Sequence, residues 1–361
     1  MFEKIWKKII RREPYTFWDI PAFLLWLISF AYRAVIYLRK LTSGTPTKVS
    51  VPVVSVGNIT VGGSGKTPLV GRLAKDLIAA GVRVGIVSSG YRRRDHTPFL
   101  LPGYKVQELD VTQTGDEIML LGYRLPEALF SVHRIKTEGA RRLADSGAVD
   151  VIIVDDGFQH FRLARDIDLV AYDAALESRL LKPFPYGMLR ESKTALARAD
   201  IIVITRAKLT VDMNAIKREV RRINPDASLY HAAFHSENIT GRDRQISVKY
   251  LNDKSVFLFA GVGNFRALER QVSALSADLD YALELSDHQS YDRALLERIK
   301  QLADRHDSDL ILTTFKDWVK IGAFDFNREF YYLDLAVDLD PGEEKLLAEI
   351  VDRLGLAPRT S

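Results

Sequence analysis

The sequence predicts an α/β fold in which a parallel β-sheet is flanked by helices. Short runs rich in β-branched residues, such as residues 149–154, have the composition of strands buried on both faces of a sheet. Segments with helical spacing of apolar side chains lie between these runs, and residues 67–80 are the clearest of them. Because parallel strands need crossover connections, this alternation of strands and helices favours a parallel sheet.

The composition is that of a folded chain with a large core. The 361 residues are 47% hydrophobic and 27% charged, which is sufficient for two domains, or for one domain with appendages. The chain has no cysteine, so a disulfide framework, a thiol nucleophile and a cysteine-based metal site are excluded. The absence of cysteine also fits a reducing compartment.

The positive charge of the chain is concentrated at its N-terminus. Nine of the 51 Lys and Arg residues, and three of the 47 Asp and Glu residues, fall in the first fifty positions. That segment therefore carries +6 and the rest of the chain carries −2, although the whole chain carries +4. The body lacks the basic balance of a nucleic-acid-binding domain, and we expect no nucleic-acid partner.

Residues 20–38 form an apolar run that is interrupted only by Pro21, Ser29 and Arg33. The run is near the minimum length for a bilayer span, but a charged side chain well inside it is costly for a spanning helix. Polar side chains share one helical face, which favours a helix lying in the membrane interface: Ser29, Arg33, Tyr37 and Lys40. A single span and an ordinary core helix are the alternatives. The run ends in Leu-Arg-Lys without a cleavage site, so a signal peptide is not expected.

The body of the chain shows two α/β patterns in succession. The first has expected strands at residues 52–57, 82–87, 149–154, 169–172 and 201–205. The second has expected strands at residues 256–260, 310–312 and 330–333, with helices at 265–276 and 291–305. Residues 206–250 are more polar and have little periodicity. The predicted domains are a membrane-associating segment at 1–44, a core at 45–205, a linker at 206–250 and a smaller α/β domain at 251–361.

A glycine-rich loop stands between the first expected strand and the first expected helix of the body. It reads Gly62-Gly63-Ser64-Gly65-Lys66-Thr67 and follows Thr60-Val61. Glycines allow main-chain N–H groups to surround phosphate oxygens, and the helix N-terminus adds a partial positive charge. Lys66 is expected to reach the β- and γ-phosphates, and Thr67 to ligate Mg²⁺. The alternative is a chance glycine-rich turn, but the flanking strand and helix favour a P-loop NTPase-like sheet.

Asp155 and Asp156 directly follow the expected strand at residues 149–154. The end of a buried parallel strand is where P-loop enzymes place a second Mg²⁺-binding element, which acts directly or through water. The alternative is an acidic pair in an exposed turn. The phosphate loop upstream favours the metal-binding role.

Gly115-Asp116-Glu117 is a second acidic motif. Thr114 and Glu117 have the spacing of a capping box before an apolar helical run, which is a structural alternative to a catalytic role. A kinase needs a carboxylate or an imidazole that accepts the proton of the attacking hydroxyl. Asp116 is the candidate for this base.

These motifs together resemble one family of kinases. Residues 56–68, which read Val-Gly-Asn-Ile-Thr-Val-Gly-Gly-Ser-Gly-Lys-Thr-Pro, are similar to the first signature of the tetraacyldisaccharide 4'-kinase family. Residues 155–160, Asp-Asp-Gly-Phe-Gln-His, are similar to its second signature, and residues 115–117 and 187–191 resemble two further blocks. The order of the motifs also agrees, and the resemblance covers roughly residues 20 to 335.

The resemblance implies ATP- and Mg²⁺-dependent transfer of the γ-phosphate to the 4'-hydroxyl of a lipid-linked glucosamine disaccharide 1-phosphate. The product would be lipid IVA, a lipid A precursor. The resemblance also implies a peripheral or monotopic enzyme at the membrane surface, on the cytoplasmic face of the bacterial inner membrane, with no obligate protein partner. Two other interpretations stay open, namely a membrane-associated P-loop ATPase or GTPase switch and an inactive binding protein derived from a kinase.

The resemblance further assigns roles to individual residues. It implies that Asp116 is the base and that His288 pairs with it. It implies a nucleotide site at residues 60–67 and Mg²⁺ ligands among Thr67, Glu117, Asp155 and Asp156. Candidates for contacts to the acceptor are Tyr91, Arg92, Arg134, Gln159, His160 and Arg190. The family has Ser-Arg-Gly-Tyr where this chain has Ser-Ser-Gly-Tyr at residues 88–91, and the missing arginine is expected to be replaced by Arg92, Arg93 or Arg94.

Overall fold

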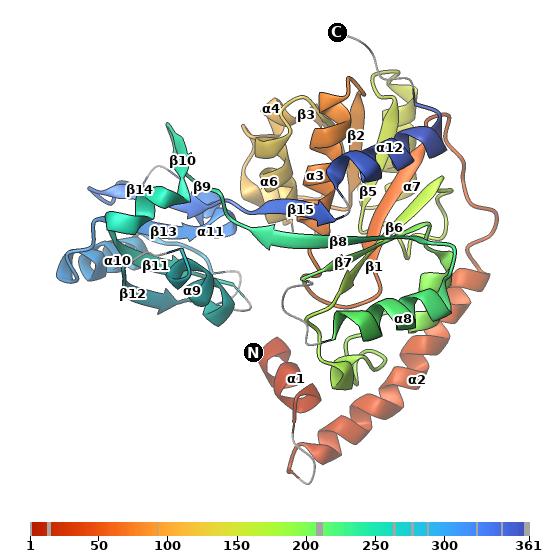
Figure 1. Ribbon diagram of the computed structural model, residues 1–361, viewed down its shortest axis with the longest axis horizontal. Coiled ribbons are helices and arrows are strands. Elements are labelled where there is room, and N and C mark those ends of the chain that lie inside the picture. The colour runs from red at the N-terminus through yellow and green to blue at the C-terminus, as the bar shows by residue number, and fades with distance from the viewer. Residues whose placement is uncertain are drawn as a thin grey trace. The chain divides into compact units, whose positions relative to one another are not determined.

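The computed structural model describes residues 2–12, 16–91, 93–206, 212–262, 265–275, 278–286, 289–322, 324–340 and 342–356. The chain forms two compact units, and each unit is built from separate stretches of sequence (Figure 1). The first unit comprises Met1–Glu108, Leu121–Ala233 and Val337–Ser361. The second comprises Leu109–Leu120 and Phe234–Ala336.

A largely parallel sheet forms the centre of the first unit. Within the described residues it has nine strands in the order β15-β8-β7-β6-β1-β5-β2-β4-β3, and β3 runs antiparallel to β4. Every residue of β1, β2, β5 and β7 is buried, because both faces of the sheet are covered. The predicted parallel α/β sheet is therefore confirmed. Its strands are β1 Val53–Asn58, β2 Val84–Ser88, β3 Phe99–Pro102, β4 Leu129–Val132, β5 Val151–Asp155, β6 Ile167–Asp173, β7 Ile201–Thr205, β8 Ser228–His235 and β15 Ala336–Asp340.

Helices cover both faces of this sheet. Ile152 and Val154 of β5 pack with Leu143 of α7, while the intervening side chains of β5 point to the opposite face, where α3 contacts the sheet. The helices associated with this unit are α3 Lys66–Ala79, α4 Gly103–Val106, α6 Asp116–Arg124, α7 Lys136–Asp145, α8 Met213–Ile223 and α12 Glu343–Leu354. In the described part of this unit, 3₁₀ turns lie at Ser178–Leu180 and Lys193–Arg198. The first residues of α6 belong to the second unit.

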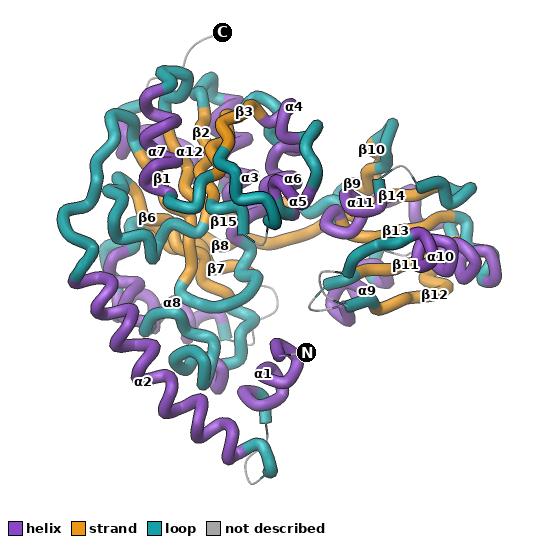
Figure 2. Tube along the Cα trace, turned by 180° about the vertical axis from the view of Figure 1, so that it is seen from behind, coloured by secondary structure: helices purple, strands orange, loops and turns teal. Residues whose placement is uncertain are grey.

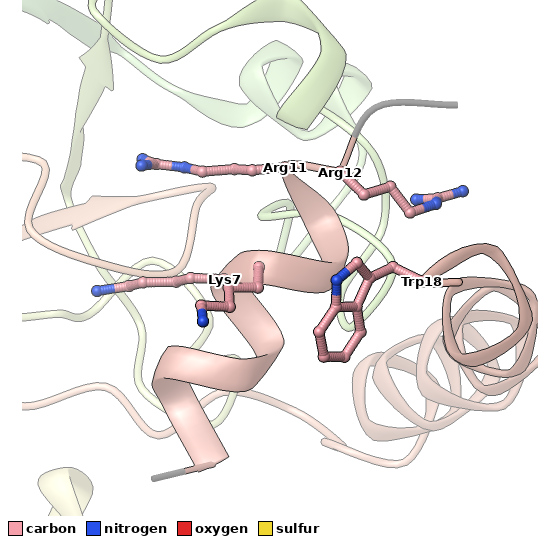
Figure 3. Close-up of a pocket in the computed structure, with 5 residues that line it drawn as sticks. Lys7, Arg11, Arg12 and Trp18 are labelled. Carbon is pink, nitrogen blue, oxygen red and sulfur yellow. The ribbon is translucent and has the colours of Figure 1, made fainter. Parts of the chain in front are cut away.

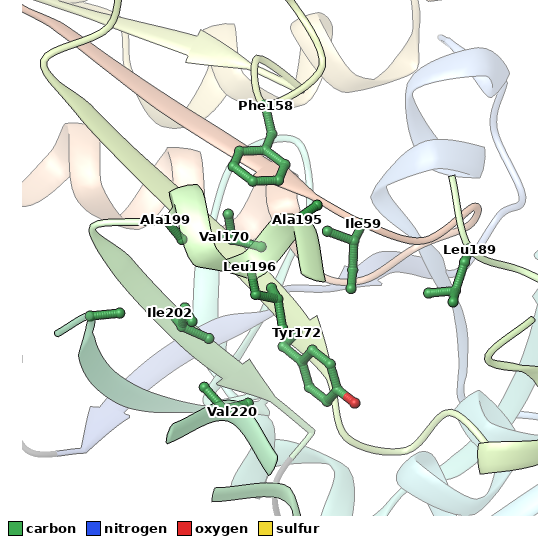
Figure 4. Packing of buried hydrophobic residues seen from close by; sticks show 11 residues of the cluster. Ile59, Phe158, Val170, Tyr172, Leu189, Ala195, Leu196, Ala199, Ile202 and Val220 are labelled. Carbon is green, nitrogen blue, oxygen red and sulfur yellow. The ribbon is translucent and has the colours of Figure 1, made fainter. Parts of the chain in front are cut away.

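One core cluster positions the segments around the predicted site. Figure 4 shows Val170 and Ile202, from β6 and β7, packed with Val220 of α8 and with Phe158, which follows the acid pair. Ile59, which precedes the phosphate loop, belongs to the same cluster. The phosphate loop and the segment after β5 are thus both anchored in one apolar core.

The second unit has its own sheet. In the described part of this unit the strand order is β10-β9-β14-β13-β11-β12, with β11 to β14 parallel and β9 and β10 antiparallel. The strands are β9 Asn238–Thr240, β10 Gln245–Ser247, β11 Ser255–Ala260, β12 Asp278–Glu284, β13 Leu310–Thr314 and β14 Glu329–Leu333. The helices are α5 Val111–Thr114, α9 Phe265–Ser273, α10 Arg293–Arg305 and α11 Phe315–Ile321, with a 3₁₀ turn at Val248–Asp253.

The expected linker at residues 206–250 contains regular structure in its described part. It includes α8, and β8 pairs in parallel with β7 of the first sheet. The apolar residues of α8 are few, but Ile216, Val220 and Ile223 fall on one face and pack into the core. The C-terminal stretch also differs from the expected division, because Val337–Ser361 returns to the first unit.

Two helices precede the first sheet, α1 Phe2–Ile10 and α2 Asp19–Leu41. α2 is one uninterrupted helix (Figure 2), and by length and composition it is apolar enough to cross a membrane. Ser29, expected on a polar face, is instead buried against the unit, and Tyr32 packs on Phe184 with ring centroids 5.1 Å apart. Most of the apolar side chains of α2 are exposed, which does not fit an ordinary core helix: Ile20, Phe23, Leu24, Leu27, Ile28, Phe30, Val35 and Leu38.

Candidate active site

The phosphate loop connects the end of β1 to the start of α3, as predicted. Gly62 and Gly65 have φ of 107° and 85°, a left-handed conformation that strongly favours glycine. Lys66 is the first residue of α3, so the loop leads directly into a helix N-terminus. Main-chain N–H groups at such a terminus attract anions, and this geometry suits a nucleotide phosphate.

Side chains from neighbouring strands hold this loop in place. Asn58 Nδ2 donates to Ser64 Oγ at 2.7 Å, and Thr205 Oγ1 donates to Ser64 O at 3.0 Å. Arg206 donates to Gly63 O at 2.6 Å through Nη2 and to Asp173 Oδ2 at 2.6 Å through Nη1. Apart from Asn58, which belongs to the first signature, no sequence pattern pointed to these residues. Their role depends on the strand order of the sheet, in which β6 pairs with β1 and β7 pairs with β6.

The acid pair lies at the end of β5, and Asp156 faces two cations. Lys66 Nζ is 3.4 Å from Asp156 Oδ1, and Arg190 Nη1 donates to both carboxylate oxygens of Asp156 at 3.0 and 2.8 Å. Burial alone would raise the pKa of Asp156, but Lys66, Arg190 and Lys136 together hold this pKa well below its usual range. Asp155 is almost fully buried, and burial raises the pKa of its carboxyl.

Lys136, the first residue of α7, lies directly behind this pair and was not predicted. Its Nζ donates to the main-chain oxygens of Asp155 and Asp156, each at 2.6 Å. The side chain is buried, and this burial lowers the pKa of the ammonium group. The sequence around Lys136 is that of a polar helix start, which carries no signal for a buried cation.

The donor set fits Mg²⁺. Among the described residues, no group of three or more His, Cys, Asp or Glu side chains is arranged to hold a metal ion. Mg²⁺ in phosphoryl-transfer sites normally needs only one or two protein carboxylates, with phosphate and water oxygens completing its shell. Asp155, Asp156 and the Thr67 hydroxyl are oxygen donors of the type that Mg²⁺ prefers.

Arg134, Gln159 and Tyr91 of the first unit were predicted to contact the acceptor substrate, and their environments differ. Arg134 is exposed just after β4, and no partner for it is found in the described part of the chain. Gln159 donates from its side-chain amide to Asn58 O at 2.8 Å and to Glu191 Oε1 at 3.0 Å, so its donors are already engaged. Tyr91 is 67% exposed.

His160 lies next to α7 rather than in open solvent. Its Nε2 is 3.1 Å from Thr137 Oγ1. Burial, with additional repulsion from Lys136 and Arg165, lowers the pKa of His160 to about 4. The imidazole is therefore neutral at physiological pH.

The arginine cluster after residue 91 is only partly described. Arg93 is buried and donates to Thr97 O and His96 O at 3.0 and 2.9 Å, so it braces its own loop. Of the three arginines expected to replace the family arginine, Arg93 therefore has its guanidinium engaged within the fold. Arg92 and His288 lie outside the described residues.

Asp116 and Glu117 begin α6 in the second unit. Asp116 Oδ2 lies 3.3 Å from Lys320 Nζ and 3.9 Å from Lys316 Nζ, both on α11. Sequence reasoning did not foresee these lysines. A capping box is present nearby, but it is formed by Asp110 and Gln113 at the start of α5. Glu117 is exposed.

Comparison with known proteins identifies the family of the chain. The sequence model of a family described as "Tetraacyldisaccharide-1-P 4'-kinase" matches residues 21–355. The tetraacyldisaccharide 4'-kinase of Halothermothrix orenii is 31% identical over 381 residues, with 96% of each chain covered. That of Syntrophotalea carbinolica is 34% identical over 319 residues, with 84% of each chain covered.

A solved structure is similar over nearly the whole chain. It is the crystal structure of the "apo" form of LpxK from Aquifex aeolicus in complex with ATP, and it is 25% identical to this chain. The match has a TM-score of 0.74 and covers 92% of this chain and 99% of that chain. The resemblance inferred from the motifs is confirmed, and this chain belongs to the tetraacyldisaccharide 4'-kinase family.

Proposed function

We propose that this protein transfers the γ-phosphate of ATP to the 4'-hydroxyl of a tetraacyldisaccharide 1-phosphate, forming lipid IVA. The observation that carries the proposal is the convergence of Lys66, Asp156 and Arg190 at the mouth of a phosphate loop, in a chain of this family. The two cations, Lys66 and Arg190, provide positive charge that binds phosphate. The carboxylate between them, Asp156, provides an oxygen ligand beside the expected metal position.

The nucleotide end of the site is assigned to residues 60–67. Main-chain N–H groups of the loop bind the phosphates, and Lys66 offsets charge on the γ-phosphate as it is transferred. Mg²⁺ would be held by Thr67, Asp155 and Asp156, with Glu117 as a further candidate, and when bound it neutralises charge on the phosphate oxygens. Lys136 stabilises the Asp155–Asp156 turn by donating hydrogen bonds to its two main-chain oxygens.

Asp116 is the proposed base, assisted by His288. As the 4'-hydroxyl attacks the γ-phosphorus in line, its proton passes to a carboxylate oxygen of Asp116, and ADP leaves. Lys316 and Lys320 are charge-complementary to the ionised carboxylate, which is the form that accepts a proton. No covalent enzyme intermediate is needed.

The acceptor carries phosphate and sugar hydroxyls, which arginines bind well. We assign Arg134 and Arg92 to the acceptor, with Arg190 shared between the acceptor and Asp156. Tyr91, which is exposed, is assigned a contact to the sugar. The side-chain donors of Gln159 are engaged within the fold, and His160 contacts Thr137. We therefore assign both residues to the wall of the site rather than to direct contacts with the acceptor.

We further propose that the protein lies on the cytoplasmic surface of the inner membrane through α2. One stripe of the helix packs on the first unit, through buried Ser29 and through Tyr32 against Phe184, near the middle of its length. A helix that spans the bilayer is surrounded by lipid near its middle, whereas α2 contacts the protein there. The exposed apolar side chains of α2 suit insertion into the interface instead.

The test is transfer of label from γ-labelled ATP to tetraacyldisaccharide 1-phosphate in mixed micelles. Labelled lipid is expected from the wild type and from Lys75→Ala, an exposed lysine on the same helix, and a loss of at least a hundredfold is expected in Lys66→Ala. Lys66-dependent phosphate release without labelled lipid would contradict the kinase and indicate an ATPase switch. ATP binding without any turnover would indicate an inactive relative.

A further inference from the structure

Arg198 is the last residue of the 3₁₀ turn at Lys193–Arg198 and lies outside every motif of the sequence analysis. Its guanidinium donates to both carboxylate oxygens of Glu191, from Nη1 to Oε2 and from Nη2 to Oε1, each at 3.0 Å. This bidentate geometry needs an arginine, because the ammonium group of a lysine does not present two parallel N–H donors. The Glu191 side chain is only 8% exposed, so the pair is largely shielded from water.

The same guanidinium lies over two aromatic rings that follow the acid pair in the sequence. Its carbon Cζ is 4.4 Å from the centre of the Phe158 ring and 5.4 Å from the centre of the Phe161 ring. Phe158 is fully buried in the core cluster of Figure 4, so it provides a fixed surface for the guanidinium. Arg198 therefore connects the segment after the acid pair with residues 187–191.

Glu191 directly follows Arg190, whose guanidinium binds the Asp156 carboxylate. The main chain of Arg190 is fixed, because its N–H donates to Ile59 O at 2.8 Å just before the phosphate loop. Its side chain is long and flexible, so the carboxylate that it binds decides where the guanidinium lies. Burial raises the pKa of Tyr32 on α2, and the charges of Arg190 and Glu191 act on the same hydroxyl with opposite sign, which places these two charges near each other.

The other end of this segment is held by α1, and the contacts there involve no acidic residue of residues 183–191. Trp6 Nε1 donates to Pro185 O at 2.7 Å. Arg12, which follows α1 (Figure 3), has its guanidinium 5.7 Å from the centre of the Tyr186 ring. Both contacts precede Arg190 by several residues, so they do not offset the charge beside it.

Loss of Arg198 would leave a buried carboxylate without this cation. Glu191 would keep a neutral donor, since Gln159 Nε2 donates to its Oε1 at 3.0 Å. A buried charge that lacks a cation is costly, so Glu191 would attract the guanidinium of the adjacent Arg190. Arg190 would then be divided between Glu191 and Asp156.

We propose that Arg198 is a positioning residue for phosphate transfer, which neutralises Glu191 and so keeps Arg190 on Asp156. The inference rests on the proposed function and adds to it a residue that touches neither the nucleotide nor the acceptor. Arg190 supplies positive charge at the transferred phosphate only while it remains beside Asp156 and Lys66. Arg198 thus acts on the reaction through Arg190.

The test compares the affinity for a fluorescent ADP analogue and Mg²⁺ with and without aluminium fluoride, which mimics the phosphoryl group during transfer. The gain in affinity on adding aluminium fluoride reports the charges around that group, and Arg190→Met should reduce this gain about tenfold. Arg198→Met should reduce it nearly as much, while the affinity for the analogue alone stays within twofold. Arg141→Met removes an exposed ion pair with Glu138 on α7 and should behave as the wild type does.

Glu191→Gln distinguishes positioning from a simple loss of packing. The amide keeps the shape of the side chain but removes the charge that competes for Arg190. The double variant Arg198→Met/Glu191→Gln should therefore recover most of the aluminium fluoride gain. In an Arg190→Met background, Arg198→Met should cause no further loss, because both changes remove the same interaction. If Arg198→Met does not fold, Arg198→Lys provides the same comparison with a smaller, severalfold loss.

Three results would overturn the inference. They are a wild-type gain in Arg198→Met, a loss that Glu191→Gln does not reverse, and an equal further loss when Arg190 is already replaced. Wild type that gains no affinity from aluminium fluoride would overturn it as well. The assay contains no acceptor, so failure of the wild type to label tetraacyldisaccharide 1-phosphate would refute the proposed function and leave the result on Arg198 valid.

Discussion

Lys136 holds Asp156 by its main chain rather than by its carboxylate, because the buried ammonium donates to the Asp156 carbonyl oxygen at 2.6 Å. Asp156 has φ of +53°, a left-handed conformation that costs a non-glycine residue about 1 kcal/mol or more. The second bond of Lys136, to Asp155 O, stabilises the same turn. The Asp156 carboxylate thereby remains directed at Lys66 and Arg190.

Replacing Lys136 with Met should therefore disturb the metal end of the site. Met keeps an unbranched apolar stem but removes the ammonium, so two buried carbonyls lose their donor. We expect the Mg²⁺ concentration for half-maximal nucleotide binding to rise severalfold, and the free energy of unfolding to fall by about 1–3 kcal/mol. Mg²⁺ titration of a fluorescent ATP analogue and urea unfolding would measure these changes. Lys75→Met is the control, and an unchanged Mg²⁺ requirement would show that Lys136 serves only the core.

Arg206 should be needed for tight nucleotide binding, although it is not in the phosphate loop. Its guanidinium joins Gly63 O to Asp173, and Ala at this position would free one side of the loop. The expected result is about a tenfold higher KM for ATP, equivalent to roughly 1.4 kcal/mol, with a smaller change in kcat. Steady-state kinetics would measure this. Arg218→Ala, an exposed position on α8, should behave as wild type, and an equal effect there would exclude a specific role for Arg206.

Asp116→Asn separates chemistry from nucleotide binding. The amide has the shape of the carboxylate but cannot accept the hydroxyl proton, so phosphate transfer should fall by about 10²–10⁴-fold. ATP affinity, measured with a fluorescent analogue, should stay within twofold. Asp145→Asn, at an exposed position on α7, serves as the control. Near-wild-type transfer by Asp116→Asn would mean that this residue only begins a helix.

The half-buried His160 should make the protein sensitive to acid. Its pKa is about 4 in the folded state, against an ordinary value of 6.5. Stability from this group is thus complete above pH 6.5 and is lost as pH falls towards 4, because the unfolded chain binds the proton first. His160→Gln should flatten this part of the pH dependence of the unfolding midpoint. Identical pH slopes for the two proteins between pH 6.5 and 4 would contradict the assignment.

The motifs with local causes were predictable. The phosphate loop depends on Gly62 and Gly65 adopting left-handed backbone angles and on a helix that starts at Lys66, and all of this lies within a few residues of sequence. The strand before Asp155 was visible because a strand buried on both faces is almost entirely β-branched. Local backbone preferences and burial therefore determined the phosphate loop and the strand that carries the acid pair.

Other features were set by which strands and helices become neighbours. Arg206 reaches the phosphate loop only because β7 pairs with β6, which in turn pairs with β1. Lys136 reaches the acid pair only because α7 packs against β5. The linker expected at residues 206–250 likewise proved to contribute α8 and β8, whose sparse apolar residues matter only once the sheet covers them.

The sequence by itself determined the class of the fold, the phosphate loop and the position of the acid pair, because these depend on the residues' own backbone preferences and on hydrophobic periodicity. The tertiary structure decided which cations surround Asp156, which lysines face Asp116, and how α1 and α2 are fixed on the first unit. These electrostatic and packing contacts join residues far apart in the chain, so they cannot be predicted from the sequence pattern around either partner.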